Sequence, residues 1–361
     1  MADFPLRLER RPAPSNAMRY AAPLLASAAM FLTGLAVFAA MDVPPLAALT
    51  AFFVTPLSSL YGVGELLLKA TPLALCALGL ALGFRANVWN IGAEGQLTLG
   101  AIAAGGIALF VAPEGAAGLP LALLAGVAGG MAWAAIPALL RTRFNTSEIL
   151  VSLMLVYVAQ LLLAWLLHGR WQDPEGFNYP QSRAFADALL LPLLGDGQRA
   201  NVAVLFVLGL AAASWVFQTR LFAGYRMLVS GLAPAAAVYA GFGERRNVWL
   251  ALLLGGGAAG LAGACEVLGP IGRLQPSISP GYGFAAIIVA FVGRLHPVGI
   301  LLASLLMSLL YLGGESVQLE LQLPAAVTGL FQGLLLFYLL GADLFVNFRL
   351  RRRAPAALVP A

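Results

Sequence analysis

The sequence contains few charged residues and few of the side chains on which catalysis depends. Charged residues make up 10% of the chain and hydrophobic residues 61%, whereas a soluble domain carries about 25% charged residues. The single lysine, Lys69, follows three leucines, so the chain lacks the Gly-Lys-Ser/Thr loop that cradles phosphates. We therefore expect a polytopic membrane protein that is not an enzyme. If ATP drives it, a separate subunit must hydrolyse the ATP.

Histidine and cysteine are also scarce. His168 and His296 are expected on opposite sides of the membrane, which excludes a His-His metal pair. Cys76 and Cys265 stand alone inside apolar runs and are expected to be small core residues. No Ser-His-acid arrangement can be assembled from the remaining residues. We expect no metal, no cofactor and no catalytic residue.

Apolar runs separated by short connections predict one all-α bundle of about ten transmembrane helices, with broken or re-entrant elements. The runs are Tyr20 to Ala40, Glu65 to Phe84, Gln96 to Val111, Leu119 to Leu140, Glu148 to Leu167, Asn201 to Phe217, Val248 to Leu268, Phe284 to Val292, Val298 to Leu312 and Pro324 to Leu340. The run from Phe284 is too short to span a bilayer and predicts a half-helix or a re-entrant element. Prolines interrupt the stretch from Pro44 to Tyr61, which we expect to be interfacial or re-entrant.

The arginines predict the orientation of the bundle. With the N-terminus in the cytoplasm, most of them fall inside: Arg7, Arg10, Arg11, Arg19, Arg85, Arg141, Arg143, Arg220, Arg226, Arg245, Arg246, Arg294, Arg349, Arg351, Arg352 and Arg353. Only Arg170, Arg183, Arg199 and Arg273 fall outside. This imbalance is the pattern of the positive-inside rule and argues against a nucleic-acid partner as the reason for the net charge of +5.

This orientation divides the chain into three parts. We expect a cytoplasmic N-terminal segment over residues 1–19, a transmembrane domain over 20–343 and a cytoplasmic basic tail over 344–361. The two long connections are an outer loop over 168–200 and an inner loop over 218–247.

A polar stretch from Gly83 to Gly100 interrupts two apolar runs. Its polar and aromatic members are Arg85, Asn87, Trp89, Asn90, Glu94 and Gln96, interleaved with Gly92 and Gly95. Irregular backbone at membrane depth is tolerated only where it is buried in protein or lines a watery cavity. We therefore expect a break between two spans at or near a translocation route. The amide and aromatic groups either face a polar solute or satisfy the broken backbone, and Glu94 is expected to accept freed backbone N–H groups or to pair with Arg85.

The inner loop contains a short Ala-rich segment. Pro234 suits the first turn of a helix and Gly241 suits its end. This helix is too short to span, so we expect it to lie along the membrane surface, where its small side chains could sit in a groove of another protein.

Three stretches resemble the inner-membrane permease subunits of bacterial ABC importers. They are Asn90-Ile-Gly-Ala-Glu-Gly-Gln96, the Ala-rich segment ending Tyr239-Ala-Gly-Phe242, and Ser279-Pro-Gly-Tyr-Gly-Phe284 followed by Val289-Ala-Phe-Val-Gly-Arg294 and His296-Pro-Val-Gly299. The likeness runs in order from about Glu65 to Asp343, and the first stretch is the most specific. Within the importers, the chain is most similar to the branch that serves ribose-type sugars, branched-chain amino acids and nucleosides, and above all to nucleoside and simple-sugar permeases.

The resemblance implies a second permease subunit, two cytoplasmic ATP-binding subunits and a periplasmic solute-binding protein, at the bacterial inner membrane. It also implies a coupling helix that docks on an ATPase, formed by Pro234, Ala235, Ala236, Ala237, Tyr239, Ala240 and Gly241. Ala233 stands where an asparagine often precedes the proline, which removes a helix cap. We expect the outer arginines to include contacts for the binding protein.

The residues by themselves leave other functions open. Intramembrane carboxylates such as Glu94 and Glu266 would also suit an ion- or proton-coupled secondary transporter. A membrane-embedded enzyme is disfavoured because histidine and lysine are nearly absent. The inner loop with its surface helix favours the importer permease. The sequence identifies neither the solute nor whether the permease pair is homodimeric or heterodimeric.

Overall fold

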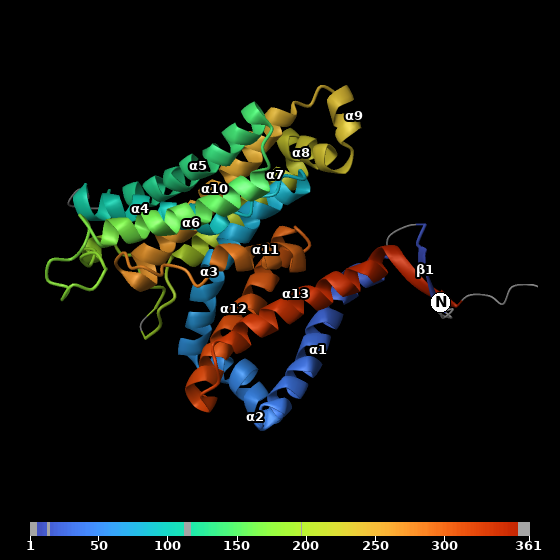
Figure 1. The fold of residues 1–361 in the computed structure, drawn as a ribbon, viewed down its shortest axis with the longest axis horizontal. Coiled ribbons are helices and arrows are strands. Elements are labelled where there is room, and N and C mark those ends of the chain that lie inside the picture. The colour runs from blue at the N-terminus through green and yellow to red at the C-terminus, as the bar shows by residue number, and fades with distance from the viewer. Residues whose placement is uncertain (1–5, 13–14, 112–116, 196, 353–361) are drawn as a thin grey trace, which may run out of the picture. The chain divides into compact units, whose positions relative to one another are not determined.

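The computed structural model describes residues 6–12, 15–111, 117–195 and 197–352, and nearly all of its regular structure is helical (Figure 1). The first half contains β1 (Leu6–Arg10), α1 (Asn16–Ala40), α2 (Pro45–Leu49), a π turn (Thr50–Val54), a 3-10 turn (Thr55–Leu57), α3 (Leu60–Arg85), α4 (Ala93–Phe110), α5 (Gly118–Phe144) and α6 (Glu148–Leu167). The second half contains a 3-10 turn (Asp187–Leu189), α7 (Ala203–Arg220), α8 (Phe222–Leu232), α9 (Pro234–Tyr239), α10 (Glu244–Glu266), a π turn (Val267–Ile271), α11 (Tyr282–Val292), α12 (Pro297–Leu321), α13 (Ala326–Asn347) and β2 (Phe348–Arg352). Within the described residues, nine helices are long and apolar enough to cross a membrane. The all-α polytopic class is confirmed.

Two shorter apolar segments accompany these spans. The helix Tyr282–Val292 has 11 residues, as its short apolar run predicts, and Pro45–Leu57 is broken into an α turn, a π turn and a 3-10 turn. Several helices extend past the apolar runs. The helix α10 begins at Glu244 and α12 continues to Leu321 because helical backbone persists through the polar residues at the ends of a span.

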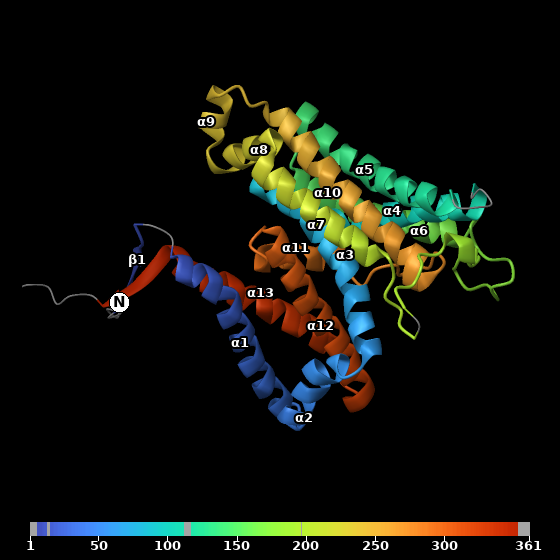
Figure 2. The ribbon, with the colours of Figure 1, turned by 180° about the vertical axis from the view of Figure 1, so that it is seen from behind.

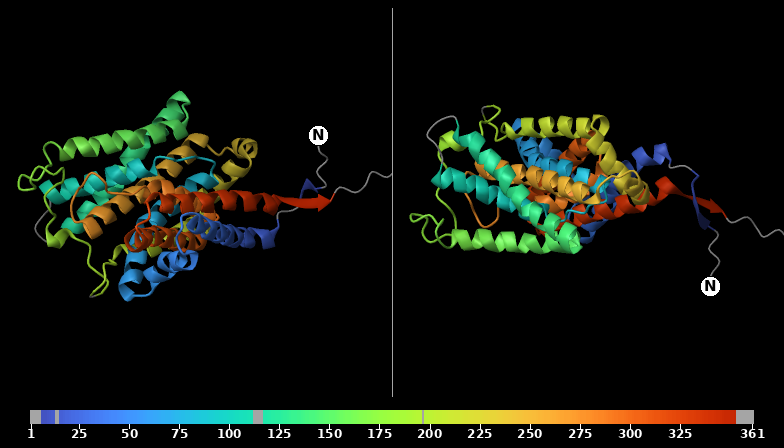
Figure 3. Two further views of the ribbon diagram at one scale, coloured as in Figure 1. Left: turned by 60° about the horizontal axis from the view of Figure 1, so that its bottom comes forward. Right: turned by 90° about the horizontal axis from the view of Figure 1, so that it is seen from above.

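The chain divides into two compact units, and the first combines residues 1–52 with 314–361. In it α1 packs along α13, and β1 pairs antiparallel with β2, with Leu8 opposite Leu350 (Figure 3). The carboxylate of Glu9 lies 3.1 Å from the Arg349 guanidinium. This strand pair was not expected from the sequence, and it places the described ends of the chain side by side. Residues 1–5, 13–14 and 353–361, which complete the expected N-terminal segment and basic tail, lie outside the described residues.

The second unit, residues 53–313, is built around α10. This helix contacts α3, α4 and α5, and Figure 2 shows it running alongside α5. Glycines at the crossings allow the backbones to touch. A Cβ on Gly100 would overlap Gly260 Cα, and a Cβ on Gly130 would overlap the Gly256 carbonyl. Small residues permit such close approach where lipid supplies no hydrophobic drive, and here they fix α4 and α5 against α10.

Candidate functional site

The break that follows α3 has a defined helix end. Asn87 takes a left-handed conformation with φ of 56°, and the Val88 N–H donates to the Gly83 carbonyl at 3.0 Å. The Asn87 N–H donates to the Phe84 carbonyl at 3.1 Å, which completes a Schellman motif. Asparagine tolerates this conformation better than most residues, so the sequence itself ends the helix here. The chain stays non-helical until α4 begins at Ala93.

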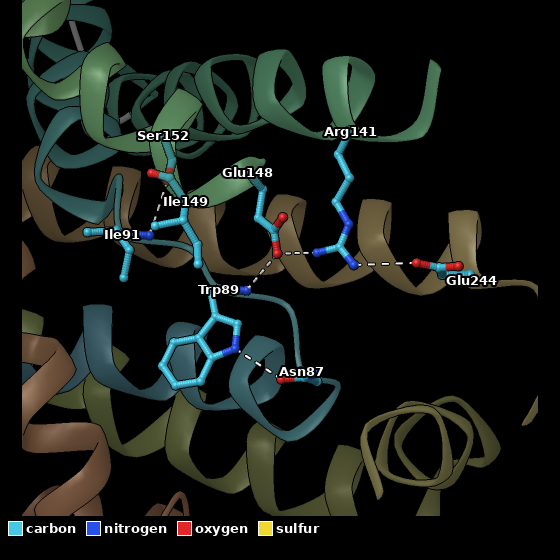
Figure 4. Close-up of polar contacts among 8 residues, drawn as sticks. All are labelled: Asn87, Trp89, Ile91, Arg141, Glu148, Ile149, Ser152 and Glu244. Carbon is cyan, nitrogen blue, oxygen red and sulfur yellow. Dashed lines mark hydrogen bonds and ion pairs between the residues drawn. The ribbon is translucent and has the colours of Figure 1, made fainter. Parts of the chain in front are cut away.

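The N–H groups of the break find acceptors outside the α3–α4 ladder (Figure 4). The Trp89 N–H donates to Glu148 Oε1 at 3.2 Å, and the Ile91 N–H donates to Ser152 Oγ at 3.2 Å. Both acceptors lie in the first two turns of α6. A Cβ on Gly92 would come within 2.8 Å of the Ser152 carbonyl oxygen, so glycine is required for the break to lie this close to α6.

Glu148 joins the break to two further helices. Its Oε1 also accepts from the Arg141 guanidinium in the last turn of α5, and Arg141 Nη2 lies 3.4 Å from Glu244 Oε1 at the start of α10 (Figure 4). Only 8% of Glu148 is exposed. Sequence reasoning missed this network. The one available signal was an acidic residue opening an apolar run seven positions after an inner arginine.

Asn90 and Gln96 satisfy each other. Asn90 Nδ2 donates to Gln96 Oε1 at 2.8 Å, and Gln96 Nε2 donates to Asn90 Oδ1 at 3.1 Å. Asn90 Oδ1 also accepts the Gly92 N–H at 3.1 Å, and both side chains are buried. Of the two roles considered for these amides, the geometry favours satisfaction of the broken backbone over contact with solute.

Trp89 is held by neighbouring aromatic rings. Its ring centroid lies 5.1 Å from that of Phe84 and 5.8 Å from that of Phe291 on α11. Its Nε1 donates to the Asn87 side chain at 3.0 Å. The indole therefore pins the break to the end of α3 and to α11.

Glu94 accepts a freed backbone N–H, one of the two partners expected for it, but the donor lies on α11 and not in the break. The Gly283 N–H, in the first turn of α11, donates to Glu94 Oε2 at 2.7 Å. A Cβ on Gly283 would overlap the Glu94 backbone nitrogen. Arg85 instead donates to the Gln218 side chain on α7. The carboxylate thus joins the N-terminal turns of α4 and α11, where the helix dipoles favour negative charge.

The surface helix α9 ends as its sequence predicts. Gly241 has φ of +75°, and the Phe242 N–H donates to the Ala237 carbonyl at 2.9 Å. Tyr239 is 97% exposed and Val238 70%, whereas Ala237 is only 3% exposed. We expected Ala237 to form one smooth docking face with Ala235, Ala236 and Ala240, but its side chain lies on the inward side of the helix.

The buried side of α9 faces the break. A cavity of about 140 Å³ lies between them, lined among others by Asn87, Arg141 and Ala237. A Cβ on Gly231, near the end of α8, would overlap the Arg85 carbonyl. The inner loop is therefore seated directly on the end of α3.

The four expected outer arginines lie in two settings. Arg170 and Arg183 are exposed on the 168–200 loop, and Arg273 is half-buried on the loop after α10. These loops are tied together, because Ser182 N–H donates to the Leu274 carbonyl and Leu274 N–H donates to Ser182 Oγ, both at 2.9 Å. Arg199 Nη1 instead lies 3.3 Å from Glu65 Oε1. Burial alone would lower the pKa of Arg199, but a hydrogen bond with Tyr61 and the charge of Glu65 raise it above its ordinary value.

Across residues 6–12, 15–111, 117–195 and 197–352, no group of three or more His, Cys, Asp or Glu side chains could hold a metal ion.

The Glu94 contact generates a prediction. Glu94→Gln keeps an oxygen that can accept the Gly283 N–H, whereas Glu94→Ala leaves this donor unsatisfied at a cost of about 1–3 kcal/mol. Both variants should transport less solute, and only Glu94→Ala should also lose membrane yield and melting temperature markedly. Wild-type uptake and yield in Glu94→Ala would show that the contact is dispensable.

Comparison with known proteins assigns the chain. The family model described as "Branched-chain amino acid transport system / permease component" matches residues 62–340. A glucose ABC transporter permease protein of Haloferax volcanii is 37% identical over 301 residues, which cover 81% of this chain and 79% of the relative. A guanosine ABC transporter permease protein of Bacillus subtilis is 30% identical over 300 residues, covering 81% of this chain and 86% of the relative.

A third relative agrees. A nucleoside ABC transporter permease protein of Lactococcus lactis is 28% identical over 264 residues, covering 71% of this chain and 72% of the relative. The family match includes the break, α9 and the start of α11. The chain therefore belongs to the permease-component family of the branched-chain amino acid transport system and is a membrane component of an ABC transporter.

Proposed function

We propose that the chain passes a sugar or a nucleoside from a periplasmic binding protein to the cytoplasm, as a permease subunit of an ATP-driven importer in a bacterial cytoplasmic membrane. The proposal is supported by two relatives named for glucose and guanosine, both of which match 81% of this chain. Glucose and guanosine share a neutral sugar ring that carries several hydroxyl groups. The solute class is therefore proposed from the chemistry that these molecules have in common.

The assembly we propose contains a second permease subunit, identical or different, two ATP-binding subunits and the solute-binding protein. The outer helices support a partner in the membrane plane. Only 22% of the apolar membrane-spanning stretch of α6 is buried within the chain. The share is also 22% for α7, and it is 28% for α5. Their remaining surface is available to lipid and to the second permease.

The main observation in support of a mechanism is that α9 lies against the break, with only a small cavity between them. We infer that α9 is the coupling helix and that Ala235, Ala236, Val238, Tyr239 and Ala240 form its docking face, because all five are exposed. Alanines lose little side-chain entropy on docking. Ala237, Pro234 and Gly241 shape and anchor the helix.

Movement of α9 has a direct route into the bundle. Asn247 on α10 accepts from Arg226 Nε at 2.8 Å and donates to Ser230 Oγ at 2.7 Å, which ties α8 to α10. Burial, together with the neighbouring Arg246 charge, lowers the pKa of Arg226. Since Gly231 lies against the Arg85 carbonyl, a push on α8 and α9 reaches the end of α3 and the break behind it.

A reconstituted transporter tests the coupling role and the solute class together. In proteoliposomes with the ATPase and binding subunits, the wild type should hydrolyse more ATP when the binding protein carries glucose or guanosine. Ala236→Glu should abolish this stimulation, because a charged side chain disrupts the docking face, while insertion and melting temperature remain unchanged. The matched control, Ala236→Ser, should retain most of the stimulation.

Two outcomes would count against the proposal. Full stimulation in Ala236→Glu would remove α9 from the ATPase interface. A membrane-impermeant reagent that labels a cysteine at position 236 from outside intact cells would overturn the orientation as well.

We also propose that three of the four outer arginines contact acidic residues of the binding protein. Arg183 and Arg273 directly follow and precede the residues of the Ser182–Leu274 hydrogen bonds, so they lie close together, and Arg170 lies on the same 168–200 loop as Arg183. Arg199 differs because Glu65 already neutralises it. We therefore assign docking chiefly to the other three.

Charge reversal tests the docking role of these three arginines. Replacing Arg170, Arg183 and Arg273 by glutamate should slow association of the binding protein several-fold at low salt and weaken its salt dependence, since exposed charges act mainly on association rate. Surface plasmon resonance at several salt concentrations measures both effects. An association rate equal to that of the wild type at low salt would refute this docking surface.

A further inference from the structure

A second polar cavity lies at the end of the 53–313 unit away from α8 and α9. It measures about 320 Å³, and its polar lining comprises Glu65, Lys69, Arg199, Glu266, Gln275 and Tyr282. These residues come from the start of α3, the end of α10, the start of α11 and two loops. The volume falls at the lower end of the range for small-molecule sites, about 300–1,000 Å³. Neither the break nor the coupling helix contributes to this cavity.

Ionisable groups of both signs meet in this cavity. Lys69 is the only lysine in the chain, and both it and Glu266 lie within membrane-spanning helices. Charged groups at such positions are costly and usually mark a solute or ion pathway. Two acidic and two basic residues line the cavity, so its formal charge is balanced.

The Glu65 carboxylate can accept more hydrogen bonds than the described residues donate to it. Its Oε1 is buried and receives no hydrogen bond from them, although Arg199 Nη1 lies 3.3 Å away as an ion partner. The residue is 8% exposed. The ion pair leaves this buried oxygen without a well-formed hydrogen bond, which is uncommon in folded proteins, and a hydroxyl group entering the cavity would supply one.

The cavity adjoins the first turn of the short helix α11. Ser279 Oγ accepts the Tyr282 N–H at 2.8 Å, and Gly281, with φ of +97°, turns the chain into the helix. Tyr282 lines the cavity, while the next residue, Gly283, donates to Glu94. One turn of α11 therefore joins this cavity to the Glu94 contact. Short helices that begin inside a membrane bundle commonly present their N-termini to solutes.

We propose that this cavity binds the neutral polyhydroxyl ring of the solute, a pyranose or the ribose of a nucleoside. The inference rests on the proposed function and adds the residues that receive the solute. Glu65 and Glu266 can accept hydrogen bonds from ring hydroxyls, Arg199 and Lys69 can donate to ring oxygens, and Gln275 can do both. The balanced charge disfavours phosphorylated or acidic solutes.

Uptake kinetics of the reconstituted complex test this proposal, with glucose and guanosine as probes. Gln275→Ala and Glu266→Gln should each raise the KM about tenfold while the maximal rate stays near that of the wild type. The Gln275 side chain donates to the Ser277 carbonyl, two residues along the same loop, at 3.0 Å, so its truncation should leave the fold intact. The control is Gln160→Ala, which truncates an exposed glutamine on α6 and should change neither constant.

The outcomes separate this inference from the proposed function. No uptake of either probe by the wild type would refute the solute class and this site with it. Uptake by the wild type with an unchanged KM in both variants would refute the site alone. A lower melting temperature in Glu266→Gln, with an unchanged KM in Gln275→Ala, would identify the cavity as a structural ion-pair cluster and also overturn the proposal.

Discussion

The Glu148 carboxylate accepts the Trp89 N–H of the break and the Arg141 guanidinium of α5 at the same oxygen, and the course of the break depends on this contact. Irregular backbone inside a membrane bundle needs partners from within the protein. A buried carboxylate likewise needs a cation, because removing one member of a buried pair costs about 3–5 kcal/mol. Glu148 meets both needs at once. It allows α3 to stop and α4 to restart without exposing unpaired groups.

The same contact relates the surface that carries α9 to the interior of the second unit. Arg141 also lies beside Glu244 at the start of α10, and it lines the cavity beneath α9 together with Asn87 and Ala237. A movement of α9 would therefore act on these polar contacts, which hold their partners in place more specifically than apolar packing does. In the first turn of α4, directly after the break, Glu94 connects this segment to α11. The proposed solute cavity begins one residue away, at Tyr282.

Sequence predicted the features that depend on neighbouring residues. Hydropathy located the spans, Asn87 with the following glycines located the break, and Pro234 with Gly241 located α9. Contacts between residues far apart in the chain could not be predicted from local patterns. Glu94 and Gly283 are 189 positions apart, and Trp89 and Glu148 are 59 apart. The β1–β2 pair was missed because each strand, read alone, resembles a basic tail. Ala237 was misplaced because six residues are too few to show which side of a helix faces inward.

Hydrogen–deuterium exchange at residue resolution tests most directly whether Glu148 holds the break. Glu148→Ala should accelerate exchange of the Trp89 amide at least tenfold, because the carboxylate oxygen that accepts this N–H is removed, while Glu148→Gln should retain most of the protection. The Ile91 amide, bonded to Ser152, should change less and serves as an internal control. Equal protection of Trp89 in Glu148→Ala and the wild type would contradict the account.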